Sequence, residues 1–265
     1  MHHKFDIRVI NLKRAKKRKK EFITNNYCIN FTFFDAIDGN KLSNNDLVNT
    51  RYFIQPLPFH TMGAYGCALS HIKLWEECVI MGTPLTIVED DAIFRHDFYK
   101  QASEVITQAK DFDIILWGFN LDSVISLDIM PNVSPAFLKF SQSNFRKYTK
   151  TFQGDTTAVY PNKLYWSLGI PAYTISPKGA KYFLENVVPI KDFNFDMTIL
   201  NIDYFDKEVF KLCSEINIGI DVSMARFYKS CNAFVSLPPL AISCNEISES
   251  YIHPFNKKNK KLIRI

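Results

Sequence analysis

Three consecutive carboxylates, Glu89-Asp90-Asp91, directly follow a short apolar run at 84–88 (PLTIV). This is informative because ligands of open α/β sheets bind beyond the carboxyl ends of the strands. Side chains two residues apart on an extended segment point the same way, so Glu89 and Asp91 can face one site. Two such carboxylates suit a hard divalent cation, Mg²⁺ or Mn²⁺, that bridges to a substrate diphosphate. The plainer alternative is a pair of solvated acids at a strand-to-turn boundary.

A second group of residues lies upstream in the sequence TMGAYGCALSH. Gly63 and Gly66 permit a tight bend and the close approach of a ligand to the backbone. They precede a helix that we expect over 70–81, with Ser70 as its N-cap and His71 in its first turn. Free N–H groups at a helix start favour a bound anion. The alternative for His71 is a hydrogen-bonded structural histidine.

Two further places could carry chemistry. Asn11 lies at the end of the first expected strand, 6–12, and Arg14 and Arg18 follow it, where polar and cationic groups could hold a nucleotide. The alternative is that these cations serve solubility. Asp196 lies in the otherwise apolar sequence FNFDMTIL. It could be an acid at a helix N-terminus or a general base with a raised pKa.

The elements that must position these residues alternate between strand and helix patterns, which favours an α/β layer architecture. Ser176-Pro177 is typical of a helix start, with a capping hydroxyl and Pro in the first turn. The stretch 120–160 is rich in Ser, Asn and aromatic residues, and we expect long loops there. The expected strands are 6–12, 31–37, 84–88, 112–117, 170–175 and 209–213; helices are expected at 13–24, 70–81, from 176, and at 196–205, with a Pro-containing run at 234–242.

Composition excludes several classes of protein. The 265 residues are 47% hydrophobic and 22% charged, which is the balance of a globular protein long enough to bury a core. Nine glycines exclude a collagen-like chain. Six dispersed cysteines without a C-x-x-C pair, and no secretory signal at the start, predict a cytosolic protein with reduced thiols. The longest apolar stretches are interrupted, so no membrane span is expected.

The net charge of +5 is unevenly distributed along the chain. Residues 13–20 hold seven cations and 257–265 hold five, and neither segment contains an acid. Taking these twelve cations away leaves −7 for the rest of the chain. The basic segments could therefore dock a non-catalytic module on an anionic membrane or on nucleic acid. Nucleic acid is disfavoured, because no aromatic residues interleave the cations and the acidic body would repel a duplex.

Taken together, these segments resemble glycosyltransferase family 25, the lipooligosaccharide galactosyltransferase family. The combination of GCALSH with a strand ending in EDD about twenty residues later is specific. The chain departs from the family at Ala64, where the family often has Glu, so any role of that Glu is absent or moved. The other resembling segments are VINLKRAKKR, FFDAIDGNKL, FDIILWG, PAYTISPKGAKYFL, FDMTIL, and PPLAIS followed by SES.

The resemblance implies a GT-A-like α/β fold, with a Rossmann-like mixed sheet flanked by helices. One domain over 1–256, with a nucleotide-binding and an acceptor-binding half, would precede a basic tail at 257–265. The implied reaction is inverting transfer of galactose from UDP-galactose, with Mn²⁺ or Mg²⁺, to a lipid-linked lipooligosaccharide or lipopolysaccharide sugar, in a β-linkage such as β-1,4. UDP-glucose or a UDP-N-acetylhexosamine is the alternative donor, since one or two hydrogen bonds distinguish them.

The resemblance also implies roles for the residues singled out above. Glu89 and Asp91 would occupy the metal-binding D-x-D position, with Asp91 the better candidate for a direct ligand. Asp196 would deprotonate the acceptor hydroxyl, and acceptor choice would lie in 120–160. The enzyme would be cytoplasmic, with weak contact to the anionic inner face of the cytoplasmic membrane. The residues expected around the donor are Asn11, Arg14, Arg18, Asp35, Gly63, Gly66, Ser70, His71 and Asp90.

Overall fold

The computed structural model describes residues 5–58, 60–193 and 217–243. Four expectations lie outside these residues: Asp196 with its helix 196–205, the strand 209–213, the SES segment, and the basic tail 257–265.

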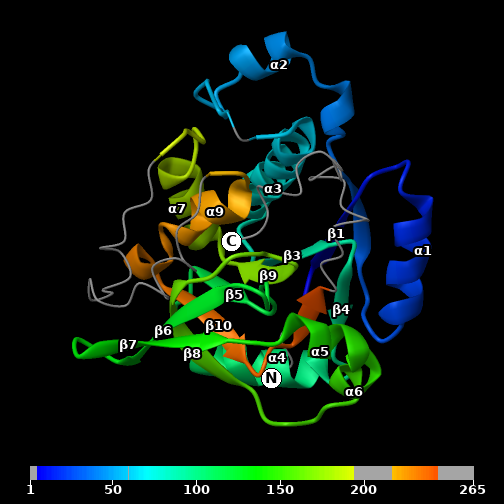
Figure 1. Cartoon of the computed structure of the whole chain (residues 1–265), viewed down its shortest axis with the longest axis vertical. Coiled ribbons are helices and arrows are strands. Elements are labelled where there is room, and N and C mark those ends of the chain that lie inside the picture. The colour runs from blue at the N-terminus through cyan, green and yellow to red at the C-terminus, as the bar shows by residue number, and fades with distance from the viewer. Residues whose placement is uncertain (1–4, 59, 194–216, 244–265) are drawn as a thin grey trace.

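A nine-stranded mixed sheet forms the centre of the fold, in the order β2-β1-β3-β9-β5-β10-β8-β6-β7 (Figure 1). A separate two-stranded sheet joins β4 and β11. This Rossmann-like mixed sheet with flanking helices confirms the predicted fold class. The strands are β1 (Ile7–Asn11), β2 (Thr32–Asp35), β3 (Leu85–Glu89), β4 (Ala92–Phe94), β5 (Ile114–Leu116), β6 (Val124–Met130), β7 (Ser134–Lys139), β8 (Tyr160–Trp166), β9 (Ala172–Ile175), β10 (Ala233–Leu237) and β11 (Ala241–Ser243).

Strand direction brings the polar strand ends together. β1 pairs in parallel with both β2 and β3, and β5 pairs in parallel with β10. β9 runs antiparallel between β3 and β5, so these two strands share one direction. The carboxyl ends of β1, β2, β3, β5 and β10 therefore meet at one edge of the sheet, which we call the carboxyl edge.

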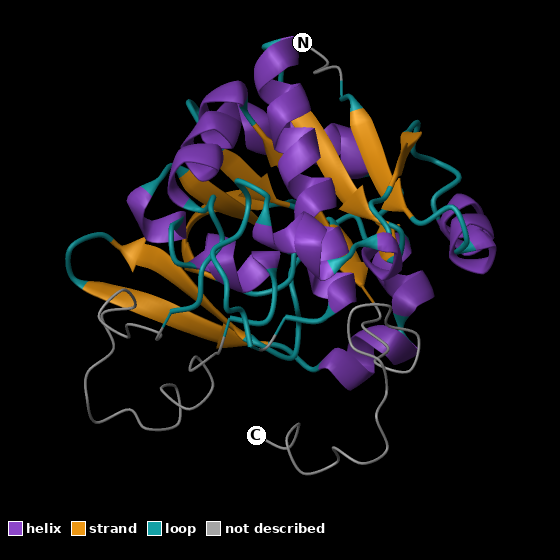
Figure 2. Cartoon of the chain, turned by 90° about the horizontal axis from the view of Figure 1, so that it is seen from above, coloured by secondary structure: helices purple, strands orange, loops and turns teal. Residues whose placement is uncertain are grey.

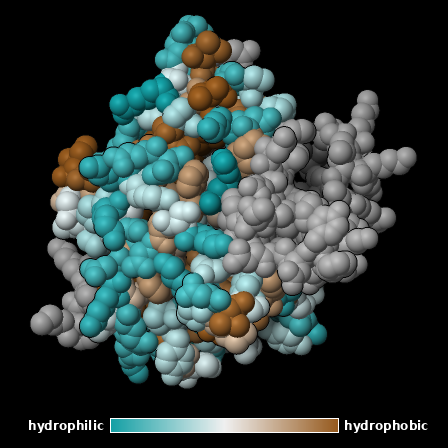
Figure 3. Space-filling model, turned by 90° about the vertical axis from the view of Figure 1, so that its left-hand side faces the viewer, coloured by the Kyte–Doolittle hydropathy of each residue, from teal (hydrophilic) through white to brown (hydrophobic). Residues whose placement is uncertain are grey.

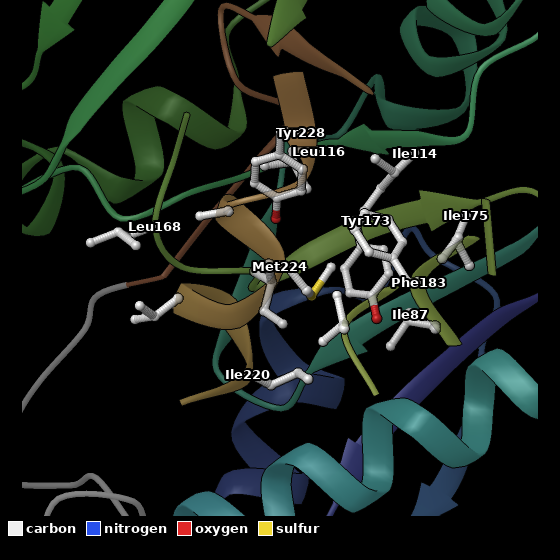
Figure 4. Close-up of a cluster of buried hydrophobic side chains, with 14 of the residues drawn as sticks. Ile87, Ile114, Leu116, Leu168, Tyr173, Ile175, Phe183, Ile220, Met224 and Tyr228 are labelled. Atoms are coloured by element: carbon white, nitrogen blue, oxygen red, sulfur yellow. The ribbon is translucent and has the colours of Figure 1, made fainter. Parts of the chain in front are cut away.

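Helices cover both faces of the sheet (Figures 1 and 2). Alternation along β3 and β5 explains the two cores: Ile87 faces one hydrophobic cluster and Val88 the other. One cluster packs against α3, α7 and α9, as Figure 4 shows for Tyr173, Phe183 and Met224. The other packs against α1 and α4. The helices are α1 (Lys16–Asn25), α2 (Asn44–Val48), α3 (Met62–Met81), α4 (Phe98–Gln108), α5 (Gln142–Lys147), α6 (Thr149–Gln153), α7 (Pro177–Asn186) and α9 (Ile220–Ala225), with short 3-10 turns η1 (Gly39–Lys41) and η3 (Tyr228–Ser230).

Most of the expected elements in the described residues are confirmed, including the start of α7. Ser176 caps this helix, because its Oγ accepts a hydrogen bond from Gly179 N at 3.0 Å. The run at 234–242 divides between β10 and β11 around two prolines.

The expectation of long loops over 120–160 is wrong. The segment contains the hairpin β6–β7, the helices α5 and α6, and the start of β8. β7, SPAFLK, is exposed or half-buried along its length, and its run of consecutive apolar residues lacks the alternation of apolar and polar residues that marks a half-buried strand. α5 and α6 are only six and five residues long, too short to show a helical stripe.

The face of the molecule drawn in Figure 3 is mostly hydrophilic among the described residues, with hydrophobic side chains in small separate groups. Within the described part of the chain, no helix has the length and apolar character needed to span a bilayer.

Candidate active site at the carboxyl edge

The carboxylate triplet lies at the carboxyl edge, where β3 leaves the large sheet. Glu89 is the last residue of β3, and Asp90 and Asp91 form the turn into β4. Asn11 ends the neighbouring β1, whose Ile10 is the register partner of Glu89. The parallel sheet thus places an amide beside three carboxylates.

Asp90 is held by two of the residues predicted to surround a nucleotide. Asn11 Nδ2 donates a hydrogen bond to Asp90 Oδ2 at 2.6 Å, and the Arg18 guanidinium lies 2.7 Å from Oδ1. The Asp90 carboxyl is nonetheless so buried that desolvation raises its pKa, and Arg18 and Asn11 only partly offset this. Asp90 thus serves to fix Arg18 and the β1 end in place.

Asp91 is the carboxylate of the triplet that has a buried oxygen without a hydrogen-bond donor among the described residues. Its Oδ2 lies 3.2 Å from the Arg18 guanidinium and accepts a hydrogen bond from Ser243 Oγ at 3.0 Å. Its Oδ1 is buried, and no donor among the described residues reaches it. Burial, followed by repulsion from Glu89, raises the Asp91 pKa to about 6 in spite of Arg18. A buried acceptor oxygen without a donor is the feature that a bound cation would satisfy.

Glu89 faces α3 on the other side of the triplet. Its Oε1 is 3.6 Å from His71 Nε2, which is too long for a hydrogen bond. His71 is fully buried, and its Nδ1 lies 2.9 Å from the Tyr173 hydroxyl, which also accepts a hydrogen bond from Trp75 Nε1. Because the indole can only donate, it uses one acceptor position of the Tyr173 hydroxyl, and the contact between this hydroxyl and Nδ1 joins His71 to the same buried network.

A thiol completes this side of the site. Ligand atoms of Cys67, His71 and Glu89 lie within 4.8 Å of one another. Burial and the negative charge of Glu89 raise the pKa of the Cys67 thiol well above its ordinary value. Cys67 is therefore a neutral thiol, and the carboxylates of Glu89 and Asp91, the predicted metal ligands, would fit Mg²⁺ or Mn²⁺ better than a thiophilic metal.

Asp221 is a carboxylate that the sequence analysis did not single out. It lies in the first turn of α9, and its Oδ2 accepts a hydrogen bond from Gly169 N at 2.9 Å. Burial, followed by repulsion from Glu89 across the site, raises its pKa. The signal was present, since Asp221 is an acid inside an apolar run, like Asp196.

The local structure expected around GCALSH is wrong. α3 begins at Met62, with Thr61 as N-cap, so Ser70 and His71 lie in its interior. Gly66 does not form a bend; a Cβ there would lie 2.5 Å from Ile37 O, so Gly permits close packing against the chain after β2. The two glycines of α3, Gly63 and Gly66, are tolerated when the remaining residues favour helix and packing offsets their cost.

Ser70 and Gly63 also join α3 to the β2–η1 connection. Ser70 Oγ donates to Gly66 O at 2.7 Å and accepts from Ile37 N at 2.9 Å. Gly63 N lies 3.0 Å from the position of a Cβ on Gly39. These residues hold β2 against α3, and the helix start that could bind an anion lies at Thr61 instead.

Arg14 and Asp35 lie apart from the triplet's contacts. Arg14 Nε donates to Asp38 Oδ2 at 2.8 Å, and Asp35 pairs with Lys13 at 3.0 Å on the surface. The structure thus joins Asn11, Arg18, Asp90 and Asp91 directly, and Glu89 with His71. The predicted roles of all these residues stay predictions.

An acid-rich carboxyl edge on a Rossmann-like sheet is where proteins of this architecture bind their ligands. The model of "Glycosyltransferase family 25 (LPS biosynthesis protein)" matches residues 4–204, and the chain belongs to this family. The predicted family is thereby confirmed.

Relatives are distant and longer. A "Glycosyltransferase 25 family member" of Aedes aegypti is 29% identical over 71% of this chain and 30% of that protein. "Procollagen lysyl hydroxylase and glycosyltransferase" of Acanthamoeba polyphaga mimivirus is 28% identical over 79% and 23%, and human "Procollagen galactosyltransferase 2" is 29% identical over 66% and 26%. The chain spans less than a third of each. Among solved structures, mannose-1-phosphate geranyltransferase from Thermus thermophilus has a TM-score of 0.39 and 9% identity over 87% of this chain and 72% of that one.

Proposed function

We propose that this glycosyltransferase moves galactose from UDP-galactose, with a divalent cation, to a sugar hydroxyl of a lipid-linked saccharide. The observation that carries the proposal is the buried Asp91 Oδ1, an acceptor without a donor among the described residues, in a triplet at the carboxyl edge. Galactose is supported by the name of the human relative, and a lipopolysaccharide acceptor by the family description. A β-linkage formed with inversion stays part of the proposal.

Glu89 and Asp91 would hold the cation, which when bound supplies positive charge to the donor diphosphate. Arg18 keeps Asp91 ionised and oriented, and Asn11 fixes Asp90, so the oxygen ligands are held in place before the donor binds. Ser243, which lies in β11 and is 152 residues away in the sequence, orients the Asp91 carboxylate by a hydrogen bond. The side chains thus provide a preorganised edge for the leaving UDP.

Inversion also requires a base on the face of the sugar opposite the leaving group. Asp196 stays our candidate for this role. Asp221 is a second candidate, because it is a buried carboxylate whose pKa is raised and which lies close enough to Glu89 to feel its charge. A general base works best when its pKa is near the working pH.

A non-catalytic docking module is less well supported. Four of the seven cations in 13–20 are used within the fold: Lys13 with Asp35, Arg14 with Asp38, Lys17 with Glu21, and Arg18 with the triplet. This leaves a smaller free positive charge on α1 for a membrane than the sequence alone suggests. Contact of 257–265 with an anionic membrane is a separate proposal.

The test is UDP release from UDP-galactose in Mn²⁺ and in chelator. We expect turnover only with the cation, and loss of turnover in Asp91→Asn with folding retained. Glu104→Gln, an exposed acid on α4, is the matched control and should behave as wild type. Turnover in chelator, or in Asp91→Asn, would rule out the cation site.

The candidate bases are separated in the same assay. Loss of the base should lower kcat while UDP binding is unchanged. We therefore compare Asp196→Asn with Asp221→Asn by turnover and by UDP titration calorimetry. A variant that loses UDP binding does not identify a base.

A further inference from the structure

A large cavity lies outside the site described above, between the short helices of 142–153 and the end of β10. Its volume is about 810 Å³. α5, α6 and the start of β8 form its walls, and the Leu237-Pro238-Pro239 corner between β10 and β11 closes one side. Cavities of this size bind small ligands.

Aromatic side chains dominate the lining, and they are of two kinds. Phe145 and Phe152 are half-buried, pack against the main core, and contact each other with their ring centroids 6.2 Å apart. Tyr148 and Tyr160 are 50% and 57% exposed. The cavity therefore combines a half-buried apolar floor with partly exposed aromatic rings, and Lys147 Nζ lies over the Tyr148 ring at 5.1 Å from its centroid.

The polar side chains that line the cavity are uncharged, apart from one acid that is paired with an arginine. The lining includes the amides of Asn144 and Asn162 and the hydroxyl of Thr151. Its one acid, Asp155, accepts hydrogen bonds from Thr157 and lies 3.3 Å from the fully buried Arg95. The described lining contains no lysine or arginine. This chemistry does not suit a diphosphate, so the cavity is not the place for the donor's anionic part.

A short stretch of chain that includes β11 connects the cavity to the candidate active site. Pro239 lines the cavity, and Ser243, four residues further on, donates to Asp91. Four residues of extended chain span at most about 14 Å. β11 is fixed along this path by pairing with β4, and Leu240 N donates to Trp117 O. Pro239 at the cavity therefore lies no more than about 14 Å from Ser243, which contacts the triplet.

We propose that this cavity binds an uncharged sugar ring of the acceptor, next to the ring whose hydroxyl is glycosylated. The apolar C–H face of a pyranose would stack on Tyr148 and Tyr160, and its hydroxyls would bond to Asn144, Asn162 and Thr151. The open tyrosines and the neutral amides favour a sugar over a purely apolar acyl chain, which needs no polar partners. This inference rests on the proposed function, because it assigns the acceptor of that reaction.

The first experiment measures binding without turnover. Methyl β-lactoside is titrated into the protein and followed by saturation-transfer NMR, with UDP titrated separately by calorimetry. We expect Tyr148→Ala and Tyr160→Ala each to weaken lactoside binding roughly tenfold, the loss of one aromatic contact. UDP binding should be unchanged. Tyr148→Phe, which keeps the ring, should bind nearly as wild type, and Tyr27→Ala, an exposed tyrosine elsewhere, is the control.

The second experiment uses turnover with UDP-galactose. Tyr160→Ala should raise KM for lactose roughly tenfold but leave KM for glucose and the donor-only hydrolysis rate unchanged, since glucose occupies only the reacting position. Octyl glucoside, which carries an alkyl chain, tests the alternative that the cavity binds an acyl chain. If the tyrosine variants lose affinity for octyl glucoside but not for lactoside, the cavity holds an acyl chain and the inference is wrong.

The two proposals can fail separately. Lactoside binding that depends on the tyrosines, in a protein without UDP-galactose turnover, would refute the donor assignment and leave the sugar cavity standing. Wild-type lactoside binding in both alanine variants, with folding checked by circular dichroism, would refute the cavity whatever the turnover.

Discussion

Replacing Arg18 by Gln tests how far this cation offsets the repulsion among the three carboxylates in the metal-free protein. The Arg18 side chain is only 18% exposed, and its guanidinium contacts both Asp90 at 2.7 Å and Asp91 at 3.2 Å. Exposed ion pairs contribute about 0–1 kcal/mol, whereas removing one partner of a buried pair costs about 3–5 kcal/mol. Because Arg18 lies between these limits, we expect Arg18→Gln to lower the free energy of unfolding by about 2–3 kcal/mol near pH 8.

The loss of unfolding free energy in Arg18→Gln should be larger near pH 8 than near pH 5. The pKa of Asp91 is raised to about 6 in the folded protein, so between its ordinary value and 6 the folded state binds more protons than the unfolded state. The ionised triplet therefore opposes folding as the pH rises through this window, and Arg18 offsets that effect. Near pH 5, Asp91 is largely protonated, and we expect the loss to fall to about 1 kcal/mol.

Urea unfolding in chelator at the two pH values measures both numbers. Lys20→Gln, another cation of α1 with an exposed side chain, is the control and should change stability by less than about 0.5 kcal/mol. An equal loss at both pH values would refute the assignment of the raised pKa to the triplet. No loss at either would show that Arg18 does not hold it.

The remaining predictions concern packing, capping and the cation. Gly66→Ala should lower the free energy of unfolding by about 1–3 kcal/mol, because its Cβ would lie 2.5 Å from Ile37 O. Gly154→Ala should be tolerated, because the nearest neighbour of its Cβ is 3.6 Å away. Urea unfolding midpoints compare the two variants. Ser176→Ala should cost about 1 kcal/mol by loss of the α7 cap, whereas Ser141→Ala at α5, which has no side-chain cap bond, should not. Mn²⁺ should raise the melting temperature of wild type in differential scanning fluorimetry and leave that of Asp91→Asn unchanged; an equal rise in both would place the ion elsewhere.

The sequence was most informative where one local rule determines the structure. PLTIV followed by three acids predicts a buried strand ending in polar groups, and β3 ends at Glu89 as expected. Ser176-Pro177 predicts the start of α7 because hydroxyl capping and the fixed φ of proline act within one turn. Family membership followed from motifs that together covered most of the chain.

It was least informative where distant segments determine the role of a residue. Ser70 is a plausible N-cap by composition, but its hydroxyl bonds Ile37 N from a segment 33 residues away. Asp221 reaches the site through the packing of α9, and Ser243 reaches Asp91 across 152 residues. No local pattern encodes these contacts. The hairpin β6–β7 was missed because an exposed outer strand carries little apolar alternation.

The position of β10 has a consequence for how the protein is made. This strand, Ala233–Leu237, lies between β5 and β8, which both precede it by about 70 residues or more. While the ribosome is still synthesising the later part of the chain, β5 and β8 each present an unpaired edge to their surroundings. Such edges are prone to intermolecular pairing, so the nascent chain should need chaperone protection until residue 237 has emerged. A fragment that ends at residue 204, where the family match stops, would leave the same gap in the middle of the sheet.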